Sequence, residues 1–309
     1  MAKKNAAVLD TSKPIKVGIA AEDKALYTTV NVVMVLWMLI IIYPLIFIVS
    51  SSFSSGNAVS AGRVLLWPVE PCVTGYKIVF AYKQVWVGFA NTIFYTVVGT
   101  ALNLLITILA AYPLARRSFQ GRGIYMTLFM ITMFFSGGII PGYINMVNLH
   151  LTNNRWSLIL PTLINVQNMI IMRTFFQNSI PGELQEAAML DGCSDFRYLI
   201  QIVIPLSKAV LSVLLLYYAV SHWNSYYSAL LYIRADNKFP LQLVLRTILI
   251  ASTSTDLTQV DSSAQQAAQN AGETMRYALI VIATVPILTV YPFIQKYFEK
   301  GVMIGSVKG

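Results

Sequence analysis

Long apolar stretches alternate with short polar segments along the whole chain, and this pattern predicts its elements. Six such stretches are present, at residues 28–50, 88–115, 124–147, 156–178, 207–233 and 277–295. Each is close to the roughly 20 apolar residues that an α-helix needs to cross a bilayer. A membrane β-barrel would instead show weak alternation over segments of about ten residues. The pattern therefore predicts an all-α membrane protein with six transmembrane helices.

Composition and charge fit this interpretation. The chain has 309 residues, of which 56% are hydrophobic and 11% charged, whereas soluble domains carry about 25% charged residues. The net charge of +9 does not indicate a nucleic-acid partner, because Lys and Arg gather at the ends of the apolar stretches, as in membrane proteins. Cys72 and Cys193 fall on opposite sides of the predicted bilayer, so no disulfide is expected.

The distribution of basic residues predicts the orientation of the chain. With six spans, both termini lie on one side, and that side carries the larger share of Lys and Arg, including Lys3, Lys4, Arg116 and Arg117. Loops rich in Lys and Arg stay inside the cell. We therefore expect a multi-pass protein of the cytoplasmic membrane with cytoplasmic N- and C-termini.

The same pattern divides the chain into segments. Residues 1–27 form a cytoplasmic tail, and residues 28–87 form a first transmembrane helix with an external segment. That helix is interpreted as retained, because its apolar run is longer than the core of a signal peptide. Residues 88–295 form the main transmembrane domain, which includes an external loop at 234–276, rich in Ser, Thr and Gln. Residues 296–309 form a cytoplasmic tail.

A polar segment at residues 181–205 interrupts the apolar pattern between the fourth and fifth stretches. Pro181 suits the first turn of a helix, Gly192 suits its end, and Ser194 suits the cap of a second helix. That second helix runs into Pro205. The segment therefore predicts a compact helix–turn–helix hairpin that faces water and holds a partner.

The hairpin resembles the EAA loop of the permease subunits of ABC importers. The matching residues, together with a carboxylate expected to face the partner, are Glu186, Ala187, Ala188, Asp191, Gly192 and Pro205. Ile204 stands where Leu is usual in the family. The resemblance implies the type I ABC importer permease fold, with six transmembrane helices and a cytoplasmic EAA coupling hairpin that docks on an ATPase.

The resemblance extends from about residue 88 to the C-terminus and is closest to sugar importers. The final run from Gln295 resembles the tail of the second permease subunit of maltose importers, which implies an ATPase contact at Lys308 and Gly309. The implied partners are a second homologous permease, two cytoplasmic ATPase subunits and an external sugar-binding protein. The implied cargo is an oligosaccharide or a polysaccharide fragment. ATP and magnesium would be bound by the ATPase subunits, so no cofactor is expected on this chain.

Sequence motifs give no support to an enzyme. The chain has no G-x-x-x-x-G-K-[ST] phosphate loop, no H-E-x-x-H and no G-x-S-x-G, so ATP hydrolysis is expected on another subunit. A secondary transporter would need acidic residues within a span for ion coupling, and no predicted span contains one. A permease of the same architecture for an amino acid, a peptide or phosphate remains an alternative.

Polar and aromatic residues in the fifth and fourth stretches are candidates for the substrate path. They are Tyr218, His222, Trp223 and Asn224, with Asn165 and Asn168 as weaker candidates. Aromatic rings and amides suit sugar binding, and polar groups within a span face a bundle or a cavity. The same residues could instead form an interfacial aromatic belt or bond neighbouring helices. Both interpretations stay open from the sequence alone.

Overall fold

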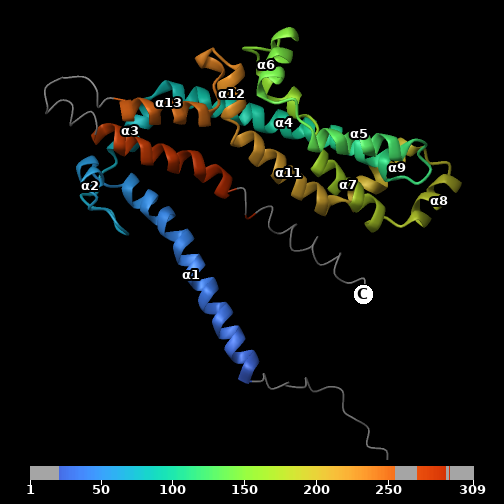
Figure 1. The fold of residues 1–309 in the computed structure, drawn as a ribbon, viewed down its shortest axis with the longest axis horizontal. Coiled ribbons are helices and arrows are strands. Elements are labelled where there is room, and N and C mark those ends of the chain that lie inside the picture. The colour runs from blue at the N-terminus through green and yellow to red at the C-terminus, as the bar shows by residue number, and fades with distance from the viewer. Residues whose placement is uncertain (1–20, 255–269, 290–291, 293–309) are drawn as a thin grey trace, which may run out of the picture. The chain divides into compact units, whose positions relative to one another are not determined.

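The computed structural model describes residues 21–254, 270–289 and 292, and in this part of the chain all regular structure is helical (Figure 1). Much of the predicted N-terminal tail, residues 255–269 of the predicted external loop, and the C-terminal tail with Lys308 and Gly309 lie outside the described residues. The chain divides into two compact units, residues 1–47 and 48–309.

Helix α1 (Ala21–Ser52) accounts for the first apolar stretch. Its side chains from Asp23 to Ile46 are exposed in this chain, although nearly all of them are apolar. The helix is long and apolar enough to cross a membrane, as are α4 (Lys83–Ala115) and the helix Asn270–Thr289. A lipid environment supplies the apolar surroundings that such side chains require.

Helix α4 is the central helix of the second unit. The helices that pack most extensively against it are α7 (Val166–Ser179), α11 (Lys208–Trp223) and α13 (Leu241–Ser254) (Figure 1). Its buried stripe consists largely of small and polar residues, among them Gly88, Thr92, Gly99, Asn103 and Thr107. Large apolar residues such as Val97 and Leu105 face outward. This arrangement is typical of helix packing in membranes, where small residues let backbones approach closely.

Three further candidate spans are pairs of helices joined at a bend. α5 (Arg122–Phe134) and α6 (Ile139–Asn148) meet at 114°, and the break between them includes Gly137 and Gly138, with Gly138 at φ 86°. The short helices η1 (Arg155–Leu158) and η2 (Leu160–Thr162) meet α7 at 47°. Residues 195–206 meet α11 at 83°. Among the residues that the structure describes, three helices can therefore span a membrane by length and composition, or up to six if each bent pair is one span.

Two predicted boundaries differ from the structure. The fifth stretch, predicted as one helix over 207–233, ends at Trp223 and resumes as α12 (Tyr227–Tyr232). The segment 234–276, predicted as a loop, contains η4 (Asp236–Lys238), α13 and the start of the last helix at residue 270. Leu241 and Val244 of α13 are buried against α4. This short apolar helix was not predicted, because polar residues flank it in the sequence.

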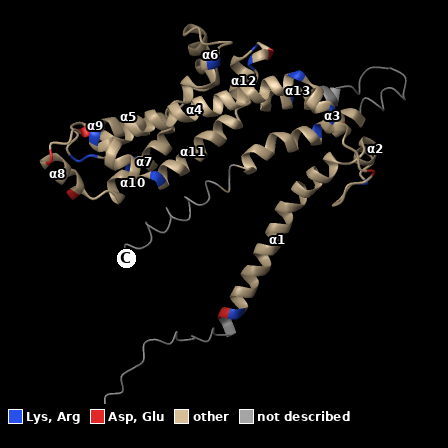
Figure 2. Cartoon of the chain, turned by 180° about the vertical axis from the view of Figure 1, so that it is seen from behind, with Lys and Arg blue, Asp and Glu red and all other residues tan. Residues whose placement is uncertain are grey.

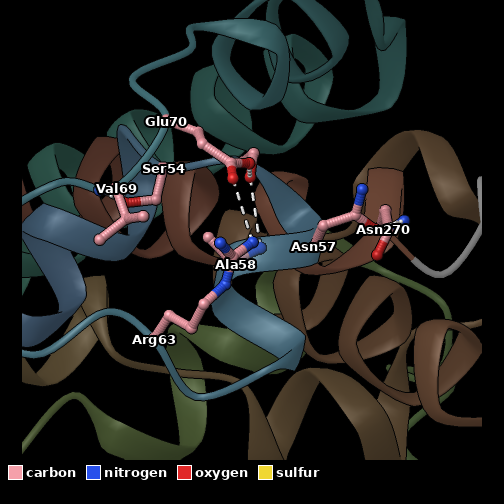
Figure 3. Close-up of polar contacts among 8 residues, drawn as sticks. Ser54, Asn57, Ala58, Arg63, Val69, Glu70 and Asn270 are labelled. Carbon is pink, nitrogen blue, oxygen red and sulfur yellow. Dashed lines mark hydrogen bonds and ion pairs between the residues drawn. The ribbon is translucent and has the colours of Figure 1, made fainter.

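The segment after α1 forms a small folded cap with α2 (Gly56–Ser60) and α3 (Thr74–Ala81) (Figure 3). Ser54 accepts a hydrogen bond from the backbone N–H of Val69 at 3.0 Å. Arg63 pairs with Glu70 at 3.0 Å, and the Ser55 hydroxyl donates to the same carboxylate at 2.5 Å. The Asn270 side chain bonds that of Asn57, which joins the cap to the last helix.

Candidate functional site

The polar segment between α7 and α11 folds as a helical hairpin. Its first helix, α8 (Gly182–Leu190), follows directly on Pro181 and ends at a glycine in the left-handed region, Gly192, with φ 73°. The N–H of Gly192 donates to the carbonyl of Met189 at 3.0 Å, and the N–H of Cys193 donates to that of Ala188 at 2.9 Å. These two bonds form the Schellman motif that ends many helices.

The second half of the hairpin continues into α11. Ser194 caps α9 (Asp195–Tyr198) by accepting from the N–H of Arg197. A π-helical turn, η3 (Leu199–Val203), and the single turn α10 (Ile204–Leu206) follow without a break. The widened turn lies directly before Pro205, which lacks the N–H that a regular α-helix would use.

An ion pair ties the hairpin to the end of α4. The guanidinium of Arg116 pairs with the carboxylate of Asp195 and also bonds the hydroxyl of Tyr112. Arg116 lies over the Tyr112 ring, 4.4 Å from its centroid, and over the Tyr198 ring at 5.6 Å. The Tyr112 hydroxyl donates to the backbone carbonyl of Asp195 at 3.2 Å. Several contacts therefore fix the start of α9 to α4.

The inner face of the hairpin belongs to a core shared with the long helices. Ala188 of α8, Tyr198 and Val203 are buried in one apolar cluster with Met172 and Phe176 of α7. A small Ala at position 188 lets α8 lie close to α7. The inner face of the hairpin therefore shares an apolar core with α7.

The outer face of the hairpin is exposed and mixes apolar with acidic side chains. Leu190 is 89% exposed and Phe196 65% exposed, and the carboxylates of Glu186 and Asp191 are also exposed. Figure 2 shows acidic residues on α8 and basic residues around α9 and α10. A rigid element that presents large apolar side chains ringed by charge is suited to dock against another protein.

Three candidate substrate-path residues are buried and hydrogen-bonded between helices. The Tyr218 hydroxyl bonds that of Thr107 at 2.7 Å. His222 bonds the Asn103 side chain at 2.7 Å, and Asn103 donates to the backbone carbonyls at 162 and 163. The indole N–H of Trp223 donates to the carbonyl of Ala283 at 3.1 Å. In this chain these side chains join α4, α11 and the last helix.

The other candidates lie at helix ends. Asn224 is the exposed residue that ends α11. Asn165 caps α7, where its side chain accepts from the N–H of Asn168 at 3.0 Å, and the side chain of Asn168 is buried. Asn165, within the fourth predicted stretch, therefore begins a helix.

Some residues of the site escaped the sequence analysis. Asn103 and Thr107 contact two of the candidates, and Tyr112 and Arg116 hold the hairpin. The sequence contains a signal for these residues: polar and small residues recur every three or four positions in the otherwise apolar stretch 88–115. Within the described part of the chain, no group of His, Cys, Asp and Glu is arranged to hold a metal ion.

Comparison with known proteins identifies the family. The chain is 40% identical over 278 residues to the polygalacturonan/rhamnogalacturonan transport system permease protein YtcP of Bacillus subtilis (strain 168), covering 89% of this chain and 96% of that protein. This chain belongs to the ABC transporter permeases. It is also 43% identical over 270 residues to the protein LplC of the same organism, covering 87% and 90% of the two chains.

A solved structure agrees with this membership. The permease matches a chain in the crystal structure of a bacterial ABC transporter involved in the import of the acidic polysaccharide alginate, with a TM-score of 0.81 and 36% identity. The match covers 90% of this chain and 98% of the other. No family model matches the chain. As a permease, the chain is an integral membrane component of a transporter and not its ATPase, and a secondary transporter is excluded.

Proposed function

We propose that this permease forms, with a second homologous permease, the path through which an ATP-driven importer moves oligosaccharides into the cell. An external solute-binding protein delivers the sugar, and two cytoplasmic ATPase subunits bind ATP and magnesium. The chain crosses the membrane six times, with both termini and the hairpin in the cytoplasm. Lys308 and Gly309 add a second ATPase contact.

The hairpin is the observation that carries this proposal. Its inner face is packed with α7 and tied to α4 by the Arg116–Asp195 pair, while Leu190 and Phe196 on its outer face are exposed. An element fixed on one side and apolar on the other can transmit the movement of a docked partner to the helices behind it. Its second half joins α11 through an 83° bend, so a movement of the hairpin is passed to a helix that packs against α4.

Two variants test the coupling role. Glu186→Lys reverses an exposed charge of α8, and Gly192→Val places a β-branched side chain at φ 73°, where it is strained by roughly 1–2 kcal/mol. Both variants are expected to lose co-purification of the ATPase or to uncouple ATP hydrolysis from uptake. Gly182→Ala is the matched control, since a Cβ there meets open space in the same hairpin.

Normal coupled uptake in both hairpin variants would contradict the assignment. Failure of the Gly182→Ala control would mean that any change in α8 disturbs folding, and the ATPase readout would then be repeated with the surface change Glu186→Gln.

The sugar class is supported by the names of the relatives. Relatives at 25% identity include an arabinooligosaccharide permease protein, AraQ, and a galactooligosaccharide permease protein, GanQ. YtcP is named for the transport of polygalacturonan and rhamnogalacturonan, and the solved structure is described as importing the acidic polysaccharide alginate. Uptake by the complete transporter with its binding protein is measured across acidic and neutral oligosaccharides. Uptake of an amino acid, a peptide or phosphate, with no sugar transported, would favour the alternative permease function.

A further inference from the structure

A cavity of about 790 Å³ lies beside the hairpin, and its walls are rich in arginine. Four arginines line it: Arg116 and Arg117 at the end of α4, Arg122 at the start of α5, and Arg173 in α7. Arg116, Arg122 and Arg173 are partly buried, and Arg117 is exposed. Two carboxylates of α8, Glu183 and Glu186, also face the cavity, so positive charge is in excess.

Three of the four arginines form no ion pair within the described part of the chain. Only Arg116 forms an ion pair there, with Asp195, and its Nε is buried without a hydrogen-bond partner. Arg173 donates from Nε to the carbonyl of Leu114 at 3.0 Å, which leaves its positive charge unbalanced. Arg122 is near enough for its charge to repel that of Arg173. Partly buried like charges held together are costly unless an anion joins them.

The helix that begins at the cavity presents an apolar face beside it. No residue of α5 is buried, and Ile124, Leu128 and Ile131 lie on one exposed face of that helix. A ligand that fills both places has an anionic head for the guanidinium groups and hydrocarbon for the α5 face. Basic pockets between transmembrane helices bind the headgroups of anionic lipids in this way, and guanidinium groups match the geometry of phosphate oxygens.

We propose that this arginine-lined cavity binds the phosphate headgroup of an anionic phospholipid, with its acyl chains along α5. An acidic surface of a partner protein fits less well, because α5, whose first residue Arg122 lines the cavity, continues as an exposed apolar helix. The proposal requires only that the chain lies in a membrane, so it does not depend on the transported solute.

The test uses the full-length chain, co-purified with its partner subunits, in nanodiscs containing equal amounts of phosphatidylglycerol and phosphatidylcholine. The transporter is then released from the nanodiscs, and the lipid that remains bound to it is identified by native mass spectrometry. We expect phosphatidylglycerol to be retained in preference. The variant Arg117→Gln/Arg122→Gln removes two charges worth about fivefold each in affinity, so retention should weaken by about tenfold to thirtyfold.

Two controls make the result specific. Arg197→Gln/Lys208→Gln removes two exposed charges that do not line the cavity and should retain the lipid. Arg117→Lys/Arg122→Lys keeps the charges and should retain most of it, which separates loss of binding from loss of fold. Equal retention by the Gln variant and the wild type would overturn the proposal.

Two other outcomes would also overturn it. The first is that millimolar inorganic phosphate displaces the bound lipid and stabilises the wild type as much as phosphatidylglycerol does, without stabilising the Gln variant. The cavity would then be a site for free phosphate. If phosphatidylglycerol is retained by the permease pair but lost whenever the ATPase subunits are present, an acidic partner surface occupies the cavity. Both results leave the uptake assays of the proposed function unaffected.

Discussion

At the scale of single residues, the packing of this permease depends on how closely α4 and α11 approach each other at Gly99. Gly99 of α4 faces the ring of His222, and a Cβ built on Gly99 would lie 2.5 Å from Nε2. The ring cannot easily move, because the same nitrogen bonds Asn103 at 2.7 Å. The glycine is therefore required by its neighbour and not by its backbone conformation.

Gly99→Ala tests this contact. The added methyl group overlaps the ring of His222, and overpacking of this kind costs about 1–3 kcal/mol. A lower unfolding temperature of the purified permease is expected. Gly123→Ala in α5 is the control, since its Cβ meets nothing within 4 Å, and it should unfold at the wild-type temperature or slightly above. Equal unfolding temperatures for the two variants would show that the contact between Gly99 and His222 is loosely packed.

A second residue-scale prediction concerns pH at the cap after α1. The hydrogen bond from Ser55 and the nearby charge of Arg63 lower the pKa of Glu70 below its ordinary value of 4.5. A lowered pKa in the folded state means that the ionised carboxylate contributes stability above the ordinary Glu pKa. This contribution is lost as the pH falls through the folded-state pKa.

Hydrogen exchange checks this expectation. The N–H of Val69, which bonds Ser54 in the same cap, should lose protection as the pH falls below about 4.5. In Glu70→Gln the protection should be lower at neutral pH and should change less with acid, after correction for intrinsic exchange. An unchanged pH profile in the variant would mean that Glu70 does not hold the cap.

At the scale of elements, the hairpin depends on its attachment to α4. The side chain of Arg116 is 11% exposed, whereas that of Asp195 is 68% exposed. Loss of the carboxylate would therefore leave a mostly buried guanidinium without its counter-charge, while loss of the arginine would leave only a solvated acid. The two partners are not equivalent.

Asp195→Ala should destabilise the permease by about 1–2 kcal/mol, a value reduced for the solvent exposure of the pair. The expected measurement is a lower unfolding temperature together with less uptake per ATP hydrolysed. Asp191→Ala, an exposed carboxylate in the same hairpin, should leave the unfolding temperature unchanged. A larger loss of stability in Asp191→Ala than in Asp195→Ala would contradict the tether.

At the scale of the whole molecule, the aromatic and polar residues of α11 hold helices together. The indole of Trp223 bonds the carbonyl of Ala283 and meets the ring of Phe89 edge-on, with centroids 5.8 Å apart. The buried position of Trp223 thus joins three helices that are far apart in sequence. The geometry favours packing over direct contact with the sugar for this residue.

Trp223→Ala should lower stability by about 3–5 kcal/mol, as truncation of a buried aromatic residue does, and should reduce assembly with the partner subunits. Trp223→Phe keeps the ring and loses the hydrogen bond, so an intermediate loss of about 1 kcal/mol is expected. The unfolding temperature and the yield of assembled transporter measure both. Weak uptake with unchanged stability and assembly would instead support a substrate-path role.

The sequence by itself determined the membrane class, the positions of the main apolar helices, and the turn and cap of the hairpin. These features depend on local composition: Gly192 ends α8 because a residue at positive φ is needed there, and Ser194 caps α9 through its own side chain. Periodic apolar runs likewise predict helices without reference to any partner.

Only the tertiary structure decided where those helices bend and what their polar residues do. Polar residues flank α13 in the sequence, so a buried helix was not predicted there. Its burial comes from contact with α4, which only the folded chain provides. The pairing of His222 with Asn103 and of Asp195 with Arg116 joins residues far apart in the chain. Whether a polar group within a span faces a path or a neighbouring helix depends on the packing of distant segments, and local sequence does not contain that information.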